Sequence, residues 1–123
     1  MITGIGIDLI EVERVMSKIN KENGFKEKIF SKGEIAFCES SLKSENYAAR
    51  FAAKEAFLKA TGLGLLLGYD LSEIEVVNDI NGKPSFNLSG NFKVQAELNS
   101  WNKIHLSLSH LQQVACAVVI IEQ

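Results

Sequence analysis

Residues 51–62 read Phe51-Ala52-Ala53-Lys54-Glu55-Ala56-Phe57-Leu58-Lys59-Ala60-Thr61-Gly62 and predict the central helix of this 123-residue chain. Gly62 is a typical helix terminator because glycine readily adopts the left-handed backbone conformation. At about 100° per residue, Glu55 lies beside Phe51 on the apolar face of the helix. An ionised carboxylate there is costly unless a cation or a metal pairs with it. The simpler alternative is an ion pair within the helix between Glu55 and Lys59.

A second carboxylate stands in the first predicted strand, residues 2–9. Gly4, Gly6 and Asp8 alternate onto one face of this strand, so another group can approach its backbone closely beside Asp8. The alternative is that Asp8 caps the following helix. Asp8 and Glu55 together would supply two hard oxygen ligands for Mg²⁺, which proteins typically hold with one or two carboxylates plus substrate phosphates.

The remaining hydrophobic periodicity predicts a single domain over residues 1–123 of the α+β class, with helices packed on a largely antiparallel sheet. Ser31 and Glu34 are typical of a capping box that opens a short helix. Segment 114–122 is apolar on both faces and is therefore expected to be a central strand. We expect helices at 12–19, after Ser31, at 44–60 and at 90–98, and strands at 2–9, 74–78, 85–88, 104–109 and 114–122.

The composition and charge of the chain argue against several classes of protein. The net charge of −2 and the pI of about 5.7 argue against a general nucleic-acid binder. No apolar stretch is long enough to span a bilayer, and no secretion signal is recognisable, so we expect a cytoplasmic protein without a membrane partner. Cys38 and Cys116 are isolated and match neither a disulfide framework nor a metal site. The apolar content of 46% is high for a small monomer and favours contact with another subunit.

Cations and glycines around the central helix suggest a phosphate-bearing ligand. Arg50, Lys54 and Lys59 supply positive charge, and a loop with glycines at 62 and 64 could expose backbone N–H groups. The sequence Gly-Lys-Ser/Thr of a P-loop is absent. His105, Ser107 and Ser109 share one strand face and could bind phosphate oxygens, or form an ordinary solvent-facing surface.

Three blocks of the chain, in this order, resemble the holo-acyl-carrier-protein synthase family, the small trimeric class of 4′-phosphopantetheinyl transferases. They are Gly-Ile-Gly-Ile-Asp-Leu-Ile-Glu at 4–11, Arg-Phe-Ala-Ala-Lys-Glu-Ala at 50–56 and His-Leu-Ser-Leu-Ser-His at 105–110. The segment Asn-Gly-Lys-Pro at 81–84 is similar to the turn before the family's next strand. The resemblance covers essentially the whole chain, and the first two blocks together are highly specific.

The resemblance implies the reaction as well as the phosphopantetheinyl transferase fold. Coenzyme A would donate its 4′-phosphopantetheine arm to a serine of apo-acyl carrier protein and leave as 3′,5′-ADP. Asp8 and Glu55 match the family's Mg²⁺ ligands, with Glu55, directly or through a metal-bound water, as the base for the serine. Lys59 matches a lysine that neutralises phosphate. The family's nucleotide cradle falls at Arg50, Lys54, Lys59, Gly62, Pro84 and His105.

The resemblance also implies a docking surface for the carrier protein. Arg14, Lys18 and Lys21 recur on one face of the predicted first helix and would contact the acidic carrier. Most of these cations are lysines where the family favours arginines. Lysine lacks the bidentate fork of arginine, so we expect docking of the carrier to be weaker or more sensitive to salt. Leu63 replaces a small polar residue found in many relatives.

The family works as a homotrimer with active sites between subunits. We therefore expect Asp8, Glu55 and Lys59 on one subunit, and Arg14 with its basic helix on the neighbour. Two other readings account for part of the sequence: a small Mg²⁺-dependent phosphate or nucleotide hydrolase, and a non-catalytic oligomeric binding module. Neither explains three ordered blocks.

Overall fold

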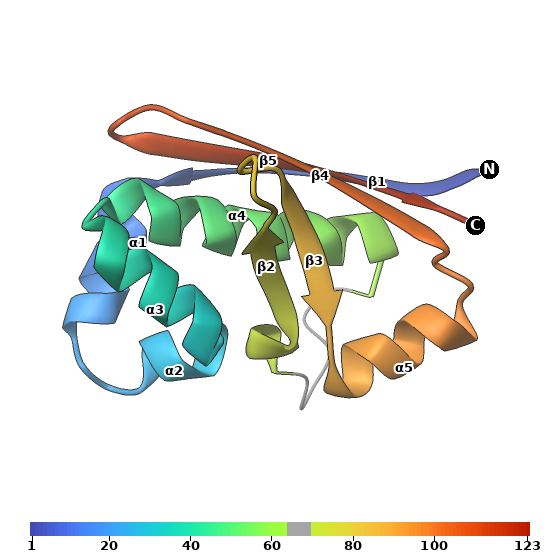
Figure 1. The fold of residues 1–123 in the computed structure, drawn as a ribbon, viewed down its shortest axis with the longest axis horizontal. Helices are drawn as coiled ribbons and strands as arrows, with labels where there is room; N and C mark the ends of the chain where they lie inside the picture. The colour runs from blue at the N-terminus through green and yellow to red at the C-terminus, as the bar shows by residue number, and fades with distance from the viewer. Residues whose placement is uncertain (64–69) are drawn as a thin grey trace.

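The computed structural model describes residues 1–63 and 70–123 and confirms the expected α+β class. Figure 1 shows the order of its elements along the chain. The helices are α1 (Val12–Asn20), α2 (Phe25–Ile29), α3 (Lys32–Ser41), α4 (Ser44–Thr61) and α5 (Gly90–Leu98), with a 3₁₀ turn η1 (Leu71–Glu73). The strands are β1 (Ile2–Glu11), β2 (Ile74–Asn78), β3 (Pro84–Leu88), β4 (Lys103–His110) and β5 (Val114–Glu122).

The strands form two antiparallel sheets instead of one continuous sheet. One sheet has the order β1-β5-β4, which confirms the prediction of β5 as a central strand, and the other is the β2-β3 hairpin. The register places Asp8 and Leu108 on either side of Ala117. The chain ends lie together at one end of the larger sheet, where the backbone N–H of Gln123 donates to the Met1 carbonyl.

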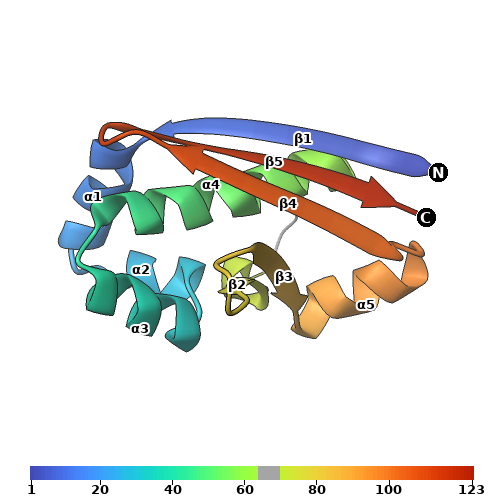
Figure 2. The ribbon, with the colours of Figure 1, turned by 45° about the horizontal axis from the view of Figure 1, so that its top comes forward.

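Helix α4 runs along one face of the three-stranded sheet and packs against β1 (Figure 2). A β-carbon on Gly4 would collide with the carbonyl oxygen of Ala60, and one on Gly6 with that of Ala56. The two glycines therefore admit the backbone of α4 itself. The predicted close approach beside Asp8 is confirmed, and the approaching group is this helix.

The opposite face of the three-stranded sheet is not covered by any described helix, and its β1 and β5 part is apolar. Ile5, Ile7 and Leu9 alternate onto it with exposures of 69%, 60% and 69%. Val118 and Ile120 of β5 continue the same face. The helices in the described residues all lie on the other side of the sheet, as Figures 1 and 2 show. A contiguous apolar surface of this kind is typical of a subunit interface.

Helix ends follow the sequence signals in two cases. Ser31 caps α3 by accepting from the Glu34 N–H, and the Glu34 carboxylate accepts from the Ser31 N–H, so the predicted capping box is confirmed. Gly62 ends α4 with φ of 73°, the left-handed conformation expected there. Asp8 is not a helix cap, because β1 continues to Glu11 and that residue occupies the cap position of α1.

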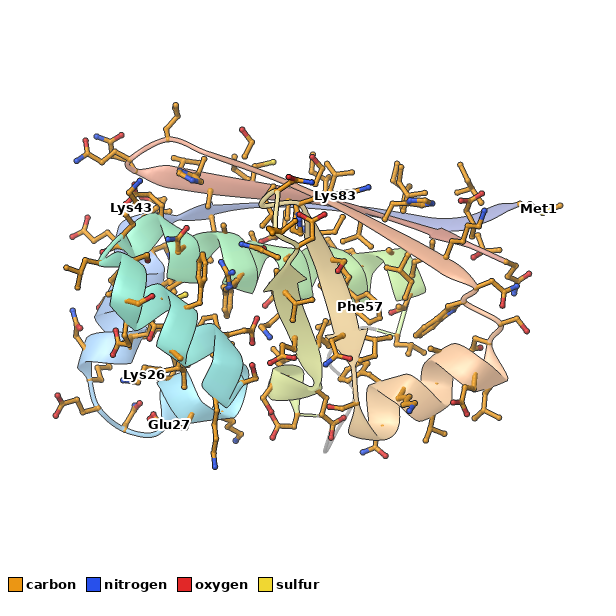
Figure 3. The ribbon with its side chains drawn as sticks, in the orientation of Figure 1. Met1, Lys26, Glu27, Lys43, Phe57 and Lys83 are labelled. Carbon is orange, nitrogen blue, oxygen red and sulfur yellow. The ribbon has the colours of Figure 1, made fainter. Side chains whose placement is uncertain are left out.

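Phe57 of α4 is the centre of the core between the helix, the hairpin and α5 (Figure 3). Its ring lies 5.3 Å from that of Phe86, 5.9 Å from that of Phe92 and 5.7 Å from that of Trp101, measured between ring centroids. These tilted and edge-to-face contacts join α4 to β3, to α5 and to the segment between α5 and β4.

A fully buried ion pair between Lys54 and Glu34 joins α3, α4 and the start of the β2-β3 hairpin. The Lys54 Nζ lies 2.8 Å from Glu34 Oε1 and also donates to the carbonyls of Leu71 and Ile74, at 3.0 and 2.6 Å. The second Glu34 oxygen accepts from the Val76 N–H at 3.0 Å. Burial lowers the pKa of Lys54, and the Glu34 carboxylate opposes that shift. The pair thereby ties α3 and α4 to the start of the β2-β3 hairpin.

Replacing Gly6 by alanine should destabilise the protein because the new methyl group cannot fit against the Ala56 carbonyl. We expect a loss of about 2 kcal/mol or more in the free energy of unfolding, measured by urea denaturation. Gly82→Ala is the matched control: its methyl group would meet no neighbouring atom, and its positive φ alone should cost about 1 kcal/mol. Equal losses for the two variants would contradict the close packing of α4 on β1.

Replacing Lys54 by methionine should cost about 3–5 kcal/mol because it leaves the Glu34 carboxylate buried without its cation. Lys43→Met, which removes an exposed lysine, should change the free energy of unfolding by less than about 0.5 kcal/mol. Urea denaturation of both variants measures the difference. A stability of Lys54→Met close to that of Lys43→Met would show that the buried pair does not hold α3 and the hairpin in place.

Candidate active site

Asp8 lies on the inner face of β1, directly beyond the glycines against which α4 packs. Its side chain is 15% exposed, and the Lys59 ammonium lies 3.1 Å from its Oδ1. Lys59 also donates to the Ile7 carbonyl at 2.9 Å. The cation from α4 is therefore held at the strand by two acceptors.

Glu55 is the neighbouring carboxylate, placed beside Asp8 by the same contact of α4 with β1. Burial raises the pKa of Glu55, and the negative charge of Asp8 raises it further, while Lys59 and Lys18 oppose the shift. Within residues 1–63 and 70–123 its carboxylate has no hydrogen-bond donor, and Lys59 pairs with Asp8 instead. The alternative of an intrahelical Glu55–Lys59 ion pair is therefore wrong.

The two carboxylates open into a hollow of about 270 Å³. Its other charged lining residues are Arg14 and Lys18 of α1, and Phe51 forms part of its apolar wall. We expected Arg14 and its helix to reach the site from a neighbouring subunit, but the structure brings both cations to the carboxylates of their own chain. The reason is that α1 begins at Val12, so its first turns must lie close to Asp8.

Lys21 lies outside this hollow. It lines an adjacent groove of about 320 Å³ along α1, together with Glu11, Glu13, Arg14, Ser17 and Lys18. The three predicted docking cations therefore divide: Arg14 and Lys18 border both spaces, and Lys21 borders the outer groove alone.

Two predicted nucleotide contacts are buried in this structure. Lys54 is fully enclosed and its ammonium donates to Glu34 and two carbonyls, so it presents no cation to a ligand. Arg50 is 3% exposed, its guanidinium stacks 4.2 Å from the centroid of Phe37, and among the described residues its Nε has no hydrogen-bond partner. Both positions lie on the face of α4 that packs toward α3. A cluster of cations in the sequence does not show whether they face another helix or a ligand.

The other predicted contacts in the described residues do not line the hollow that holds Asp8 and Glu55. His105 is on the uncovered face of the sheet, where its Nε2 lies 2.6 Å from Glu122 Oε2. Pro84 begins β3 opposite Asn78, and Gly62 ends α4. Gly64, the other glycine of the predicted phosphate loop, lies outside the described residues. One subunit therefore assembles Asp8, Glu55, Lys59, Arg14 and Lys18, and leaves His105 on the opposite side of the sheet.

Phe25 and Phe51 support the site in a way that sequence spacing did not indicate. Their ring centroids lie 6.1 Å apart, and the Lys18 ammonium lies 5.7 Å from the first and 5.9 Å from the second. Phe25 opens α2, a short helix that we did not predict. The useful signal was the aromatic residue seven positions after Lys18, just past the predicted first helix.

The donor set fits a hard divalent cation better than a transition metal. The carboxylates of Asp8 and Glu55 line one hollow, Glu55 has no hydrogen-bond donor in the part of the chain that the structure describes, and Lys59, Arg14 and Lys18 lie around them. The described residues contain no group of three or more His, Cys, Asp and Glu side chains arranged to bind a metal. Mg²⁺ is commonly held by one or two carboxylates with the remaining positions filled by water and phosphate. The nearby cations suit an anionic, phosphate-bearing ligand.

Comparison with known proteins agrees with this chemistry. A model of the 4′-phosphopantetheinyl transferase superfamily matches residues 4–119. The holo-[acyl-carrier-protein] synthase of Cytophaga hutchinsonii is 42% identical over 123 residues, covering 98% of this chain and 97% of that protein. None of the helices in the described residues has the length and hydropathy needed to cross a membrane.

Solved structures of the same family share the fold. The holo-[acyl-carrier-protein] synthase of Neisseria meningitidis superposes with a TM-score of 0.91 at 30% identity, covering 100% of both chains. The Bacillus anthracis enzyme, solved in complex with coenzyme A (3′,5′-ADP), has a TM-score of 0.80 at 37% identity, covering 98% of this chain and 96% of that one. The match over nearly the full length, together with the carboxylate site, places this chain in the holo-[acyl-carrier-protein] synthase family of 4′-phosphopantetheinyl transferases.

Proposed function

We propose that this protein transfers the 4′-phosphopantetheine group of coenzyme A to a serine of apo-acyl carrier protein. The serine oxygen forms a bond to the phosphorus that carries pantetheine, the bond from that phosphorus to the bridging oxygen breaks, and 3′,5′-ADP leaves. The observation that carries this proposal is the Asp8–Glu55 carboxylate pair, facing Arg14 and Lys18 across one hollow in a chain of this family.

Asp8 and Glu55 are the residues that would hold Mg²⁺. When bound, the ion would neutralise the negative charge of the coenzyme's phosphates. Lys59 is held at the Ile7 carbonyl as well as at Asp8, so it can keep its place beside the strand when the Asp8 oxygen takes another partner. We assign to it the neutralisation of charge on the leaving phosphate.

Glu55 is our candidate for accepting the proton of the carrier serine, directly or through a water. Its carboxylate lines the same hollow as Asp8, where an acceptor hydroxyl would meet it beside the coenzyme's phosphates. The absence of a hydrogen-bond donor to Glu55 within the described residues leaves its oxygens available for this role.

The contacts to the nucleotide are proposed with two changes from the sequence expectation. Lys59, Gly62, Pro84 and His105 remain candidates for contacts with the nucleotide. Lys54 is reassigned to the core because its ammonium is enclosed, and Arg50, stacked on Phe37, lines a separate hollow of about 330 Å³ beside β2. Substitution of Lys54 should therefore change stability before it changes coenzyme binding.

Replacing Asp8 by asparagine or Glu55 by glutamine should reduce transfer roughly a hundredfold or more, because each change removes an anionic metal ligand and Glu55→Gln also removes the proposed base. Intact-mass spectrometry of an apo-acyl carrier protein, incubated with coenzyme A and Mg²⁺, measures the added phosphopantetheine group. Glu97→Gln on the exposed side of α5 is the control and should transfer normally.

The same assay separates this function from the two alternatives. The wild-type chain should modify the carrier in Mg²⁺ and leave it unmodified in EDTA. Turnover of coenzyme A or nucleoside triphosphates without a carrier would favour a hydrolase. No mass gain on any of several carriers, with a folded protein, would favour a binding module and refute the proposed transfer.

We further propose that the protein is a homotrimer with sites between subunits. The uncovered apolar face of β1 and β5 supports an interface there. His105 belongs to this same side of the sheet and is separated from Asp8 within one chain, so an interface would be needed for both to serve one site. A cytoplasmic location is still a prediction from the sequence.

Replacing Ile7 by lysine should dissociate the trimer because it places a charge in the centre of the apolar face. Light scattering coupled to size exclusion should give the mass of one chain for Ile7→Lys and of three chains for the wild type. Val94→Lys, a similar change on exposed α5, should remain trimeric. A monomeric wild type, or a trimeric Ile7→Lys variant, would contradict an interface on this face.

A further inference from the structure

A row of polar side chains runs along the outer face of β4, at the edge of the three-stranded sheet. Lys103, His105, Ser107 and Ser109 alternate onto this face, which they share with the apolar residues of β1 and β5. A subunit contact on the apolar part would make this row its polar border. A cation, an imidazole and two hydroxyls can all bind phosphate oxygens.

Glu122 of β5 holds the His105 ring from the neighbouring strand. Its Oε2 lies 2.6 Å from His105 Nε2. The Glu122 backbone is fixed, because its carbonyl accepts from the Asn102 N–H at 2.9 Å and β5 pairs with a strand on either side. The side chain of His105 is 55% exposed and that of Glu122 is 33% exposed. The carboxylate is therefore the more enclosed partner, and the ring is open to a ligand.

The groups around Glu122 keep its carboxylate ionised. The hydrogen bond with His105 lowers the pKa of Glu122, and the charges of His105, Lys103 and the Met1 amino group lower it further, against the effect of burial. An ionised carboxylate only accepts hydrogen bonds, so the contact with His105 requires a proton on Nε2. Among the residues that the structure describes, none hydrogen-bonds the other ring nitrogen, Nδ1. Nδ1 is therefore the atom that His105 offers to a ligand.

We propose that Glu122 is a positioning residue that orients His105 so that its Nδ1 donates to a phosphate of coenzyme A at the subunit contact. This inference rests on the proposed function and deepens it, because it assigns a role to a carboxylate outside the Asp8–Glu55 pair. Nδ1 can donate to a phosphate oxygen only when the ring carries a second proton. The negative charge of Glu122 stabilises the imidazolium that results.

A carboxylate in a phosphate-binding surface needs a physical reason, because it repels the ligand. Glu122 directs its charge to the Nε2 side of the ring, and the free Nδ1 is on the other side of the same ring. The imidazole can therefore lie between the carboxylate and the phosphate and bond to both. Proteins use the same order of carboxylate, imidazole and bound group to fix the orientation of functional histidines.

The test compares Glu122→Gln with the wild type in steady-state transfer. Glu122→Gln should raise the KM for coenzyme A about tenfold and leave kcat and the KM for the carrier unchanged, because only a phosphate contact is weakened. Glu122→Asp keeps the charge and should show a smaller increase. Glu97→Gln on α5 controls for the loss of one carboxylate. Light scattering and melting temperatures should show that every variant keeps the mass and the fold of the wild type.

A double-mutant cycle shows whether Glu122 acts through His105. His105→Asn should weaken the binding of coenzyme A in calorimetry, and Glu122→Gln should add little in that background. Nitrogen-15 NMR of the ring provides a second readout at a slightly alkaline pH, where a free imidazole is neutral. Coenzyme A should bring both ring nitrogens of His105 to the protonated form in the wild type and not in Glu122→Gln. His110, the other of the two histidines, is the internal reference.

Three outcomes would overturn the inference: additive effects of the two substitutions, unchanged coenzyme affinity in Glu122→Gln, or a His105 ring that stays singly protonated in the wild-type complex. Dephospho-coenzyme A locates the phosphate, since the effect of Glu122→Gln should vanish if the contact is to the 3′-phosphate and persist if it is to the pyrophosphate. A wild type that shows these signatures with coenzyme A but modifies no carrier would refute the proposed transfer and leave the role of Glu122 intact.

Discussion

The contact of α4 with the backbone of β1 is the constraint on which the rest of the structure depends. Gly4 and Gly6 bring the helix so close that no side chain fits between them. This packing fixes the rotation of α4, and therefore which of its side chains face the strand. Glu55 is directed to Asp8, and Lys59 reaches the same strand from the next turn. The site is thus a consequence of how the largest helix is seated.

One helix serves two purposes because its faces differ in their surroundings. Toward β1 it carries a half-buried carboxylate without a hydrogen-bond donor among the described residues, an arrangement that costs stability in the absence of a cation. Toward α3 and the hairpin it carries Lys54, whose charge is fully satisfied by Glu34 and two carbonyls. A satisfied buried charge organises the fold, and an unsatisfied one is available for chemistry.

Much of this could be predicted from the sequence, and the failures have a physical explanation. The alternation in β1, the capping box at Ser31 and the apolar β5 are local signals, and the structure confirms them. Periodicity placed Glu55 on the apolar face of the helix. It could not show that Lys54 points into the core, because a cluster of cations has the same sequence pattern whether it pairs with a buried glutamate or with phosphate. The place of Arg14 and Lys18 beside Asp8 depends on tertiary packing of α1, which spacing within one helix does not define.

The most direct test of the account is the binding of Mn²⁺, as a spectroscopic substitute for Mg²⁺, in the presence of coenzyme A. Electron paramagnetic resonance counts the bound ions. The account predicts one ion per chain in the wild type, and loss of that ion in Asp8→Asn and in Glu55→Gln while the Glu97→Gln protein retains it. Binding that persists undiminished in both carboxylate variants would contradict the claim that the seating of α4 on β1 builds a metal site.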